Sequence, residues 1–364
     1  MELEALRSYP GHPEYATLLG LLERYSPSGE EDAAVAWLVA HMHALGYTSA
    51  FADPAGNAVG VIGAGPRQVL MLGHIDTVPG QIPLRLQDGN IYGRGSVDAK
   101  GPLAAFVQAA ARLGAVPGWQ FVVIGGRDEE RQSLGARYVA TQYRPDFAII
   151  GEPSQWQRLT LGYKGSAQAT LTVRRERAHS ASGVENACEA AVGAWGALQA
   201  WAAGYNASRP RAFDQALPVL TGLASGEDGF ANWASLQVNA RLPLELPPQA
   251  WYARLDELAA AIPGAVVHPQ GYAIPAYLAQ KNTPLVRAFL AGIRAAGGQP
   301  GFVLKSGTAD LNVVAPGWGC PAVAYGPGDS ALDHTPGEHL SLEEFSRAVA
   351  VLQAVLRQLA HAPA

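Results

Sequence analysis

The sequence is poor in cysteine and carries no excess of positive charge. Its 364 residues include only two cysteines, Cys188 and Cys320, which lie far apart and outside any CxxC pattern. They therefore predict neither a disulfide framework nor a thiolate zinc site, and they fit a reducing compartment. The 26 basic residues are outnumbered by 31 acidic ones, giving a net charge of −5. The basic excess of a nucleic-acid-binding protein is absent.

Long apolar runs are also missing. No segment reaches the roughly 18 apolar residues of a membrane span, and Met1–Arg7 shows no basic region followed by an apolar core. We therefore expect no membrane span, no targeting signal and a cytoplasmic location. A composition of 48% hydrophobic and 16% charged residues excludes a disordered chain, and the length suggests two domains.

Lysine is scarce as well. Only four of the 26 basic residues are lysines, namely Lys100, Lys164, Lys281 and Lys305. A codon bias toward arginine explains the scarcity, but it explains the positions less well. Three of the four lysines lie in or beside the motifs described below.

Short apolar runs alternate with helical segments through the first part of the chain. The runs are rich in Val, Ile and Leu and end in turn residues, as buried strands do; they cover Ala58–Ile62, Gln68–Leu72, Phe121–Ile124 and Phe147–Ile150. Helices are predicted over Ala33–Leu45 and Pro102–Leu113, and the same texture returns after Pro275. This pattern predicts the α/β class, with a central, mostly parallel sheet and helices on both faces.

The pattern changes near Gly162. Apolar and polar residues alternate over Ser166–Arg174 and Leu236–Leu242, as in a sheet with one solvated face, and helices are predicted over Ala187–Ala203 and Trp251–Ile262. We therefore expect one domain formed by residues 1–162 and 276–364, interrupted by a smaller inserted α+β domain, residues 163–275.

Polar residues follow several of the predicted strands. His74 and Asp76 share one face at the carboxyl end of the strand over Gln68–Leu72, where open α/β sheets place their ligands. Alone, such a pair is more often a histidine held by a loop carboxylate. Further candidates lie in a glycine-rich turn, after two other strands and in a late turn-rich loop; they are Asp98, Glu129, Glu130, Glu152 and His334.

Each candidate alone has an ordinary explanation, such as a helix N-cap for Asp98 or a solvated loop for the acidic run at 128–130. Together they supply two histidines and at least three carboxylates without a thiolate, the ligand mixture of a hydrolytic zinc or cobalt pair. No HExxH, GxSxG or Walker A motif is present to suggest another chemistry.

The segments HIDTVPG, YGRGSVDAKG, DEE, GEPS and HTPGEHL resemble the M20 family of dinuclear zinc peptidases and deacylases, in order and over essentially the whole chain. The resemblance implies a zinc-peptidase-like catalytic domain with two Zn²⁺ or Co²⁺ ions per subunit. By that resemblance, His74 and Glu152 would bind one metal, Glu130 and His334 the other, and Asp98 would bridge them. Asp76 would orient His74, and Glu129 would be the general base.

The inserted domain resembles the lid of the same family, which implies a homodimer. His179 resembles the lid histidine that stabilises the oxyanion, often in the partner subunit's site, although a surface histidine remains an alternative. Asn232 and Arg241 resemble residues that hold the substrate carboxylate, with a solvated strand arginine as the alternative. Gly307 and Thr308 are predicted to bind substrate with them.

Within the family, the segments 305–310 and 326–330 resemble hydrolases that release lysine from the C-terminal glutamate of an acidic amino-group carrier protein. We expect the same reaction here, in amino-acid biosynthesis, with ornithine as a second substrate. A local basic cluster could steer the carrier, though a solvated strand face explains it equally well; its members are Lys164, Arg174, Arg175 and Arg177.

Three alternatives stay open. One is an N-acetylornithine or other N-acyl amino-acid deacetylase, and another is a broad dipeptidase or carboxypeptidase. A non-catalytic binding protein of the same family is disfavoured, because Glu129 and all five predicted ligands are present.

Overall fold

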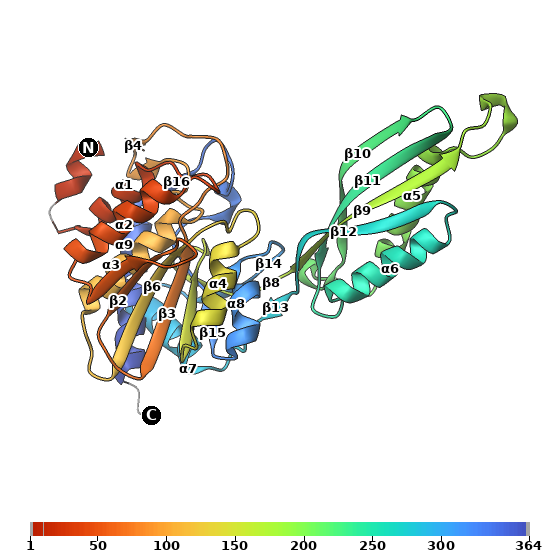
Figure 1. Cartoon of the computed structure of the whole chain (residues 1–364). Coiled ribbons are helices and arrows are strands. Elements are labelled where there is room, and N and C mark those ends of the chain that lie inside the picture. The colour runs from red at the N-terminus through yellow and green to blue at the C-terminus, as the bar shows by residue number, and fades with distance from the viewer. Residues whose placement is uncertain (1–2, 10, 362–364) are drawn as a thin grey trace. The chain divides into compact units, whose positions relative to one another are not determined.

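The computed structural model describes residues 3–9 and 11–361, and the chain forms two compact units (Figure 1). The first unit combines Met1–Gly162, Ala279–Val303 and Ala309–Ala364, and the second combines Tyr163–Leu278 and Leu304–Thr308. The insertion predicted at 163–275 thus extends to 278 and takes in a short later segment, 304–308. Among the residues described, no helix has both the length and the apolar character needed to cross a membrane.

The first unit is built on a sheet with the strand order β1-β2-β6-β3-β7-β15-β8. The four neighbours β6, β3, β7 and β15 run parallel, whereas β2 pairs antiparallel with β6 and β8 with β15. The predicted α/β class with a parallel centre is therefore confirmed. The strands are β1 (Ser49–Ala52), β2 (Ala58–Ile62), β3 (Arg67–His74), β6 (Trp119–Gly126), β7 (Phe147–Gly151), β8 (Arg158–Tyr163) and β15 (Ala322–Ala324), with β14 (Gly301–Lys305) beside β8.

Helices cover both faces of this sheet, as two neighbouring residues of β6 show. Gly125 faces Leu38 and Leu103, whereas Gly126 lies on the opposite face, next to the Asp310 carboxylate. Leu38 and Leu103 belong to α2 (Asp32–Ala44) and α3 (Lys100–Leu113). The other helices are α1 (Glu14–Leu22), α4 (Leu134–Gln142), α7 (Pro284–Ala295), α8 (Asp310–Trp318) and α9 (Leu342–His361). A small sheet of β4 (Arg85–Gln87), β5 (Asn90–Tyr92) and β16 (His339–Ser341) completes the unit, with the short helices η1 (Leu3–Ser8) and η4 (Ser330–Leu332).

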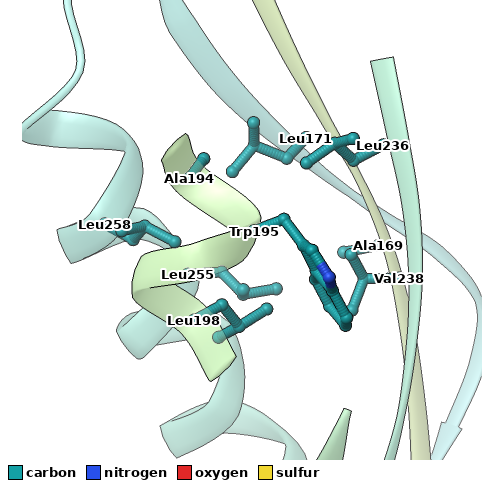
Figure 2. A pocket seen from close by; sticks show the side chains of 9 residues that line it. All are labelled: Ala169, Leu171, Ala194, Trp195, Leu198, Leu236, Val238, Leu255 and Leu258. Atoms are coloured by element: carbon teal, nitrogen blue, oxygen red, sulfur yellow. The ribbon is translucent and has the colours of Figure 1, made fainter. Parts of the chain in front are cut away.

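The second unit is an antiparallel sheet, β10-β11-β9-β12, backed on one face by two helices (Figure 1). Its elements are β9 (Gly165–Glu176), η2 (Ser180–Ser182), α5 (Ala187–Asn206), η3 (Ala212–Asp214), β10 (Leu217–Glu227), β11 (Ala231–Leu242), α6 (Pro248–Ala260), β12 (Ala265–Ile274) and β13 (Tyr277–Leu278). Figure 2 shows part of its apolar core, where Leu198 of α5, Leu255 of α6 and Leu236 of β11 line one pocket. The predicted strands β9 and β11 and helices α5 and α6 are present. The edge strands β10 and β12 were not predicted, because their apolar residues show no regular alternation.

Two of the four lysines are fully buried, each against backbone carbonyls. The Lys100 ammonium donates to the carbonyls of Leu21, at 3.3 Å, and Arg24, at 2.6 Å. The Lys164 ammonium donates to three carbonyls of one turn, those of Ala212 (3.1 Å), Phe213 (3.0 Å) and Gln215. A compact ammonium with three donors fits such a cup, and a planar guanidinium does not. Packing therefore explains why these positions keep lysine.

We expect Lys164→Met to lower the free energy of unfolding by about 1–3 kcal/mol, because buried carbonyls lose their donor. Lys281→Met removes an exposed ammonium and should change stability by less than about 0.5 kcal/mol. Urea unfolding followed by circular dichroism measures both variants, and equal losses would contradict the structural role of Lys164.

Candidate metal centre

The predicted ligands gather at the carboxyl ends of the parallel strands of the first unit. His74 is the last residue of β3, Glu129 and Glu130 follow β6, and Glu152 follows β7. Parallel neighbours end at the same edge of a sheet, which brings these side chains to one crevice. Asp98, just before α3, and His334, in the loop after η4, reach the same place through the contacts described next.

The Asp98 carboxylate lies between the two histidines. Its Oδ1 is 3.1 Å from Nε2 of His74, and its Oδ2 is 3.0 Å from Nε2 of His334. The same His334 nitrogen is 3.1 Å from Oε1 of Glu130. A carboxylate that turns one oxygen to each of two imidazoles has the arrangement needed to serve two neighbouring cations.

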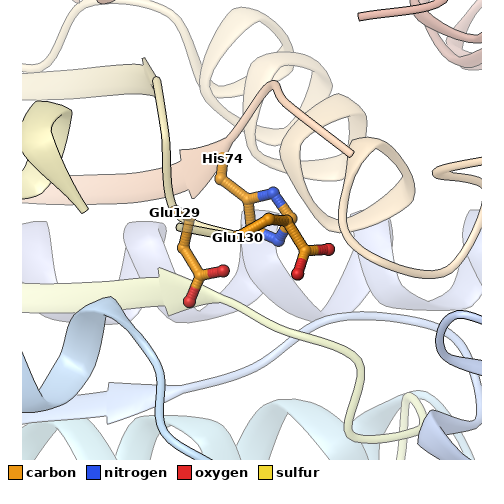
Figure 3. Close-up of side chains that lie close together, drawn as sticks. All are labelled: His74, Glu129 and Glu130. Atoms are coloured by element: carbon orange, nitrogen blue, oxygen red, sulfur yellow. The ribbon is translucent and has the colours of Figure 1, made fainter. Parts of the chain in front are cut away.

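Within residues 3–9 and 11–361, two groups of side chains have potential ligand atoms within 4.8 Å of one another. One group is His74, Glu129 and Glu130 (Figure 3), and the other is Asp98, Glu130 and His334. Nitrogen and oxygen donors without sulfur suit Zn²⁺ and similar divalent ions, so the residues present fit a metal centre. Glu152 belongs to neither group, although it is buried and its charge raises the pKa of Glu129.

The electrostatics of the crevice follow from burying several acids together. Burial raises the pKa of Glu129 well above its usual range, and the charges of Glu152, Asp310 and Glu130 add to the effect while His74 opposes it. Hydrogen bonds to Asp98 and Glu130 raise the pKa of His334 to about 10. The clustered negative charges therefore favour protonation of the groups next to them. A bound cation would compensate the same negative charge.

Asp76 connects the end of β3 to the acidic loop. Its Oδ1 accepts the backbone N–H of Glu129 at 3.1 Å, and its Oδ2 accepts that of Glu130 at 3.2 Å and the Ser28 hydroxyl at 2.7 Å. The predicted contact with His74 is made mainly by the Asp76 backbone carbonyl, 2.9 Å from Nδ1, while the carboxylate lies 3.6 Å away. The Asp76 carboxylate thus fixes the loop that carries two potential ligands.

The remaining predicted site residues lie in the second unit. Arg241, on β11, donates to the hydroxyl of Thr308, which brings together the predicted residues Arg241, Gly307 and Thr308. The Asn232 side-chain oxygen accepts the backbone N–H of Ala187 at 2.8 Å, at the start of α5. His179 is exposed just before η2.

The expected basic cluster at the start of the second unit is not a free positive surface. Lys164 is buried, and each of the three arginines faces a carboxylate supplied by a neighbouring loop or strand: Arg174 pairs with Asp228, Arg175 with Glu185 and Arg177 with Glu227. These pairs reduce the net positive charge of the cluster, and steering of an acidic carrier by it stays a prediction.

Three buried charged residues beside the centre were missed in the sequence. Asp310 is 2% exposed and accepts a hydrogen bond from Ser133, while Glu338 pairs with Arg94. All three lie inside the quoted segments, but no ligand spacing distinguishes them. Burial of the charged side chain is the property that separates all three from ordinary loop residues, and it is visible only in the fold.

We expect Asp76→Asn to weaken metal binding by about 10–100-fold, the usual effect of losing a residue that orients ligands. Asparagine keeps the shape but has one acceptor oxygen for two backbone N–H groups. A matched control is Asp146→Asn, since Asp146 also accepts a backbone N–H, at 2.7 Å from Gln68, on an exposed site. Competition with a chromophoric chelator measures the affinity, and an unchanged value in the Asp76 variant would refute this role.

Comparison with known proteins agrees with this architecture. Residues 70–358 match the model of peptidase family M20/M25/M40. The [LysW]-lysine hydrolase of Deinococcus radiodurans is 44% identical over 92% of this chain and 93% of its own, and a putative [LysW]-lysine/[LysW]-ornithine hydrolase of Thermococcus kodakarensis is 40% identical over 93% and 90%.

A solved structure shows the same fold. It is a dinuclear metal-binding peptidase of the M20 family from Bacillus subtilis, with a TM-score of 0.71 at 15% identity, and the match covers 98% of this chain and 99% of the other. Because the family model matches most of its length, the chain belongs to peptidase family M20.

Proposed function

We propose that this M20 enzyme hydrolyses the amide bond that joins lysine to the amino-group carrier protein LysW, and that it accepts LysW-linked ornithine as a second substrate. The 44% identity to a [LysW]-lysine hydrolase over nearly the whole chain supports the substrate. The observation that carries the chemistry is the Asp98 carboxylate set between His74 and His334. The reaction belongs to amino-acid biosynthesis and is expected in the cytoplasm.

Two metal ions, zinc or cobalt, fit the donor set. In this proposal His74 and Glu152 would hold one ion, Glu130 and His334 would hold the other, and Asp98 would contribute to both sites. The grouping of Asp98, Glu130 and His334 supports the second set, whereas Glu152 rests on the family resemblance alone. Two such ions, when bound, polarise an amide carbonyl and lower the pKa of a water molecule.

Glu129 acts as the general base. Its carboxylate takes a proton from the attacking water and delivers it to the amine nitrogen of lysine as the amide C–N bond breaks. Its burial next to His74 supports this role, because a shielded carboxylate holds the proton between the two steps.

The second unit supplies the substrate-binding residues in this proposal. Arg241, supported by Thr308 beside Gly307, binds the α-carboxylate of the released amino acid through its planar fork. Asn232 assists there, and His179 stabilises the oxyanion in the site of a partner subunit.

We expect Glu129→Gln to lower kcat by roughly 10²–10⁴-fold while the protein keeps its metal, because proton transfer is lost and all five proposed metal ligands are unchanged. Release of lysine from LysW measures the rate, and metal analysis of the purified variant is the control. Full activity of the variant would exclude Glu129 as the base. A wild-type protein without metal and without hydrolysis would indicate a binding protein.

Substrate choice is tested by comparing kcat/KM on LysW-linked lysine, LysW-linked ornithine, N-acetylornithine and a dipeptide. The proposal expects the highest value on LysW-linked lysine. Ornithine is shorter by one methylene, which is worth about 10–200-fold in a fitted pocket. A higher value on N-acetylornithine or on the dipeptide would replace this function with deacetylase or peptidase activity.

We also propose a homodimer formed through β10, an edge strand of the second unit. Val219 on this strand is 53% exposed. The opposite edge, β12, contains Pro269 and a register shift between Gln270 and Ile274, which disfavour pairing with a further strand. A long edge strand with exposed apolar residues pairs readily with a second copy.

We expect the wild-type chain to sediment as a dimer and Val219→Glu to shift it to monomer, because a charge is placed in the paired edge. Val266 of β12 offers a matched control, since it is the same residue type with 52% exposure, and Val266→Glu should leave the dimer intact. Sedimentation velocity decides; a monomeric wild type, or the same shift in both variants, would rule out this interface.

A further inference from the structure

Glu338 connects two loops that carry proposed metal ligands. It ends the loop that contains His334, and its carboxylate is completely buried. Its Oε1 accepts the backbone N–H groups of Val97, at 2.9 Å, and Asp98, at 3.1 Å. Its backbone carbonyl accepts the N–H of Gly93 at 3.3 Å. One residue thus holds the glycine-rich turn, residues 93–98, at both of its ends.

Arg94 compensates the buried charge of Glu338. Its Nη1 donates to Oε2 of Glu338 at 2.7 Å, and its Nε donates to the carbonyl of Gly80 at 3.0 Å. A buried carboxylate costs several kcal/mol unless it is paired and hydrogen-bonded. Glu338 has both oxygens occupied by protein donors, so it is not itself placed as a metal ligand.

The Glu338–Arg94 ion pair affects the position of two proposed metal ligands, Asp98 and His334. The N–H that Glu338 Oε1 accepts belongs to Asp98, whose carboxylate faces both histidines. His334 lies four residues before Glu338 and has a positive φ of 62°, a conformation that a non-glycine residue keeps only when its surroundings impose it. Fixing Glu338 therefore fixes the separation between the Asp98 backbone and the His334 loop.

We propose that Glu338, held by Arg94, is a positioning residue. It fixes the separation between Asp98 and His334 that metal binding by the group of Asp98, Glu130 and His334 requires. This inference rests on the metal centre of the proposed function but not on its substrate. Ligands that are already in place lose less conformational freedom when a metal binds, so the ion pair increases metal affinity without touching the ion.

The test starts from purified, zinc-loaded protein dialysed against increasing concentrations of a chelator, with zinc per chain as the readout. We expect Glu338→Gln to lose one of its two zinc ions at about 10–100-fold lower chelator concentration than the wild type. Glutamine has a single acceptor oxygen, which cannot serve both Arg94 and the backbone N–H groups. Arg94→Lys keeps the charge but not the second hydrogen bond and should show a smaller loss.

The control is a buried ion pair far from the ligands. Glu14 is buried and accepts hydrogen bonds from Arg112, His12 and Ser346, so Glu14→Gln damages a similar network. It should lower the melting temperature and leave zinc retention unchanged. Equal zinc loss in the Glu14 variant, or wild-type retention in both Glu338→Gln and Arg94→Lys, would overturn the positioning role. If Glu338→Gln does not fold, Arg94→Lys alone decides.

A wild-type protein that retains no zinc at all would instead refute the metal centre itself. A wild type that holds two ions but does not act on LysW-linked lysine would refute only the substrate. The failure of this inference is therefore distinguishable from failure of the proposed function.

Discussion

Repulsion between clustered, poorly solvated carboxylates is the constraint on which the rest of the first unit depends. Asp98 and Glu130 must lie close together to offer ligand atoms to a cation, with Glu129 beside Glu130, and in a poorly solvated site these acids destabilise one another. The fold counters this repulsion with fixed partners. Imidazoles, backbone N–H groups and the Arg94 guanidinium surround the acids, and all of them are delivered by loops at one edge of the sheet.

Some carboxylates also hold the backbone of other acidic residues in place. Asp76 holds the backbone of Glu129 and Glu130, and Glu338 holds the backbone of Asp98. A carboxylate is suited to this task because it offers two acceptor oxygens with several lone pairs and can bind N–H groups from separate segments at once. The chain thus fixes its potential ligands by their main chain and leaves their side chains facing the crevice.

The sequence predicted much of this arrangement, and its failures have a physical cause. The strand at 67–74 was recognised over Gln68–Leu72 because its apolar run is continuous, and the residues that follow such a run must lie at the ligand-binding edge. Glu338 and Asp310 were missed because an acid in a loop gives no sign that it will be buried. The ion pairs of the basic cluster were missed for the converse reason. Arg174, Arg175 and Arg177 are clustered in the sequence, but their partners at 228, 185 and 227 come close only after folding.

The buried ammonium groups of Lys100 and Lys164 have an evolutionary consequence. Each sits in a cup of main-chain oxygens that a guanidinium does not fill. Mutational drift toward arginine can therefore replace lysine across the surface and is stopped at these two sites. In a chain with so few lysines, the presence of a lysine gives information about its site. The stronger the drift, the more reliably a surviving lysine marks a place where the backbone, and not the side chains around it, selects the residue.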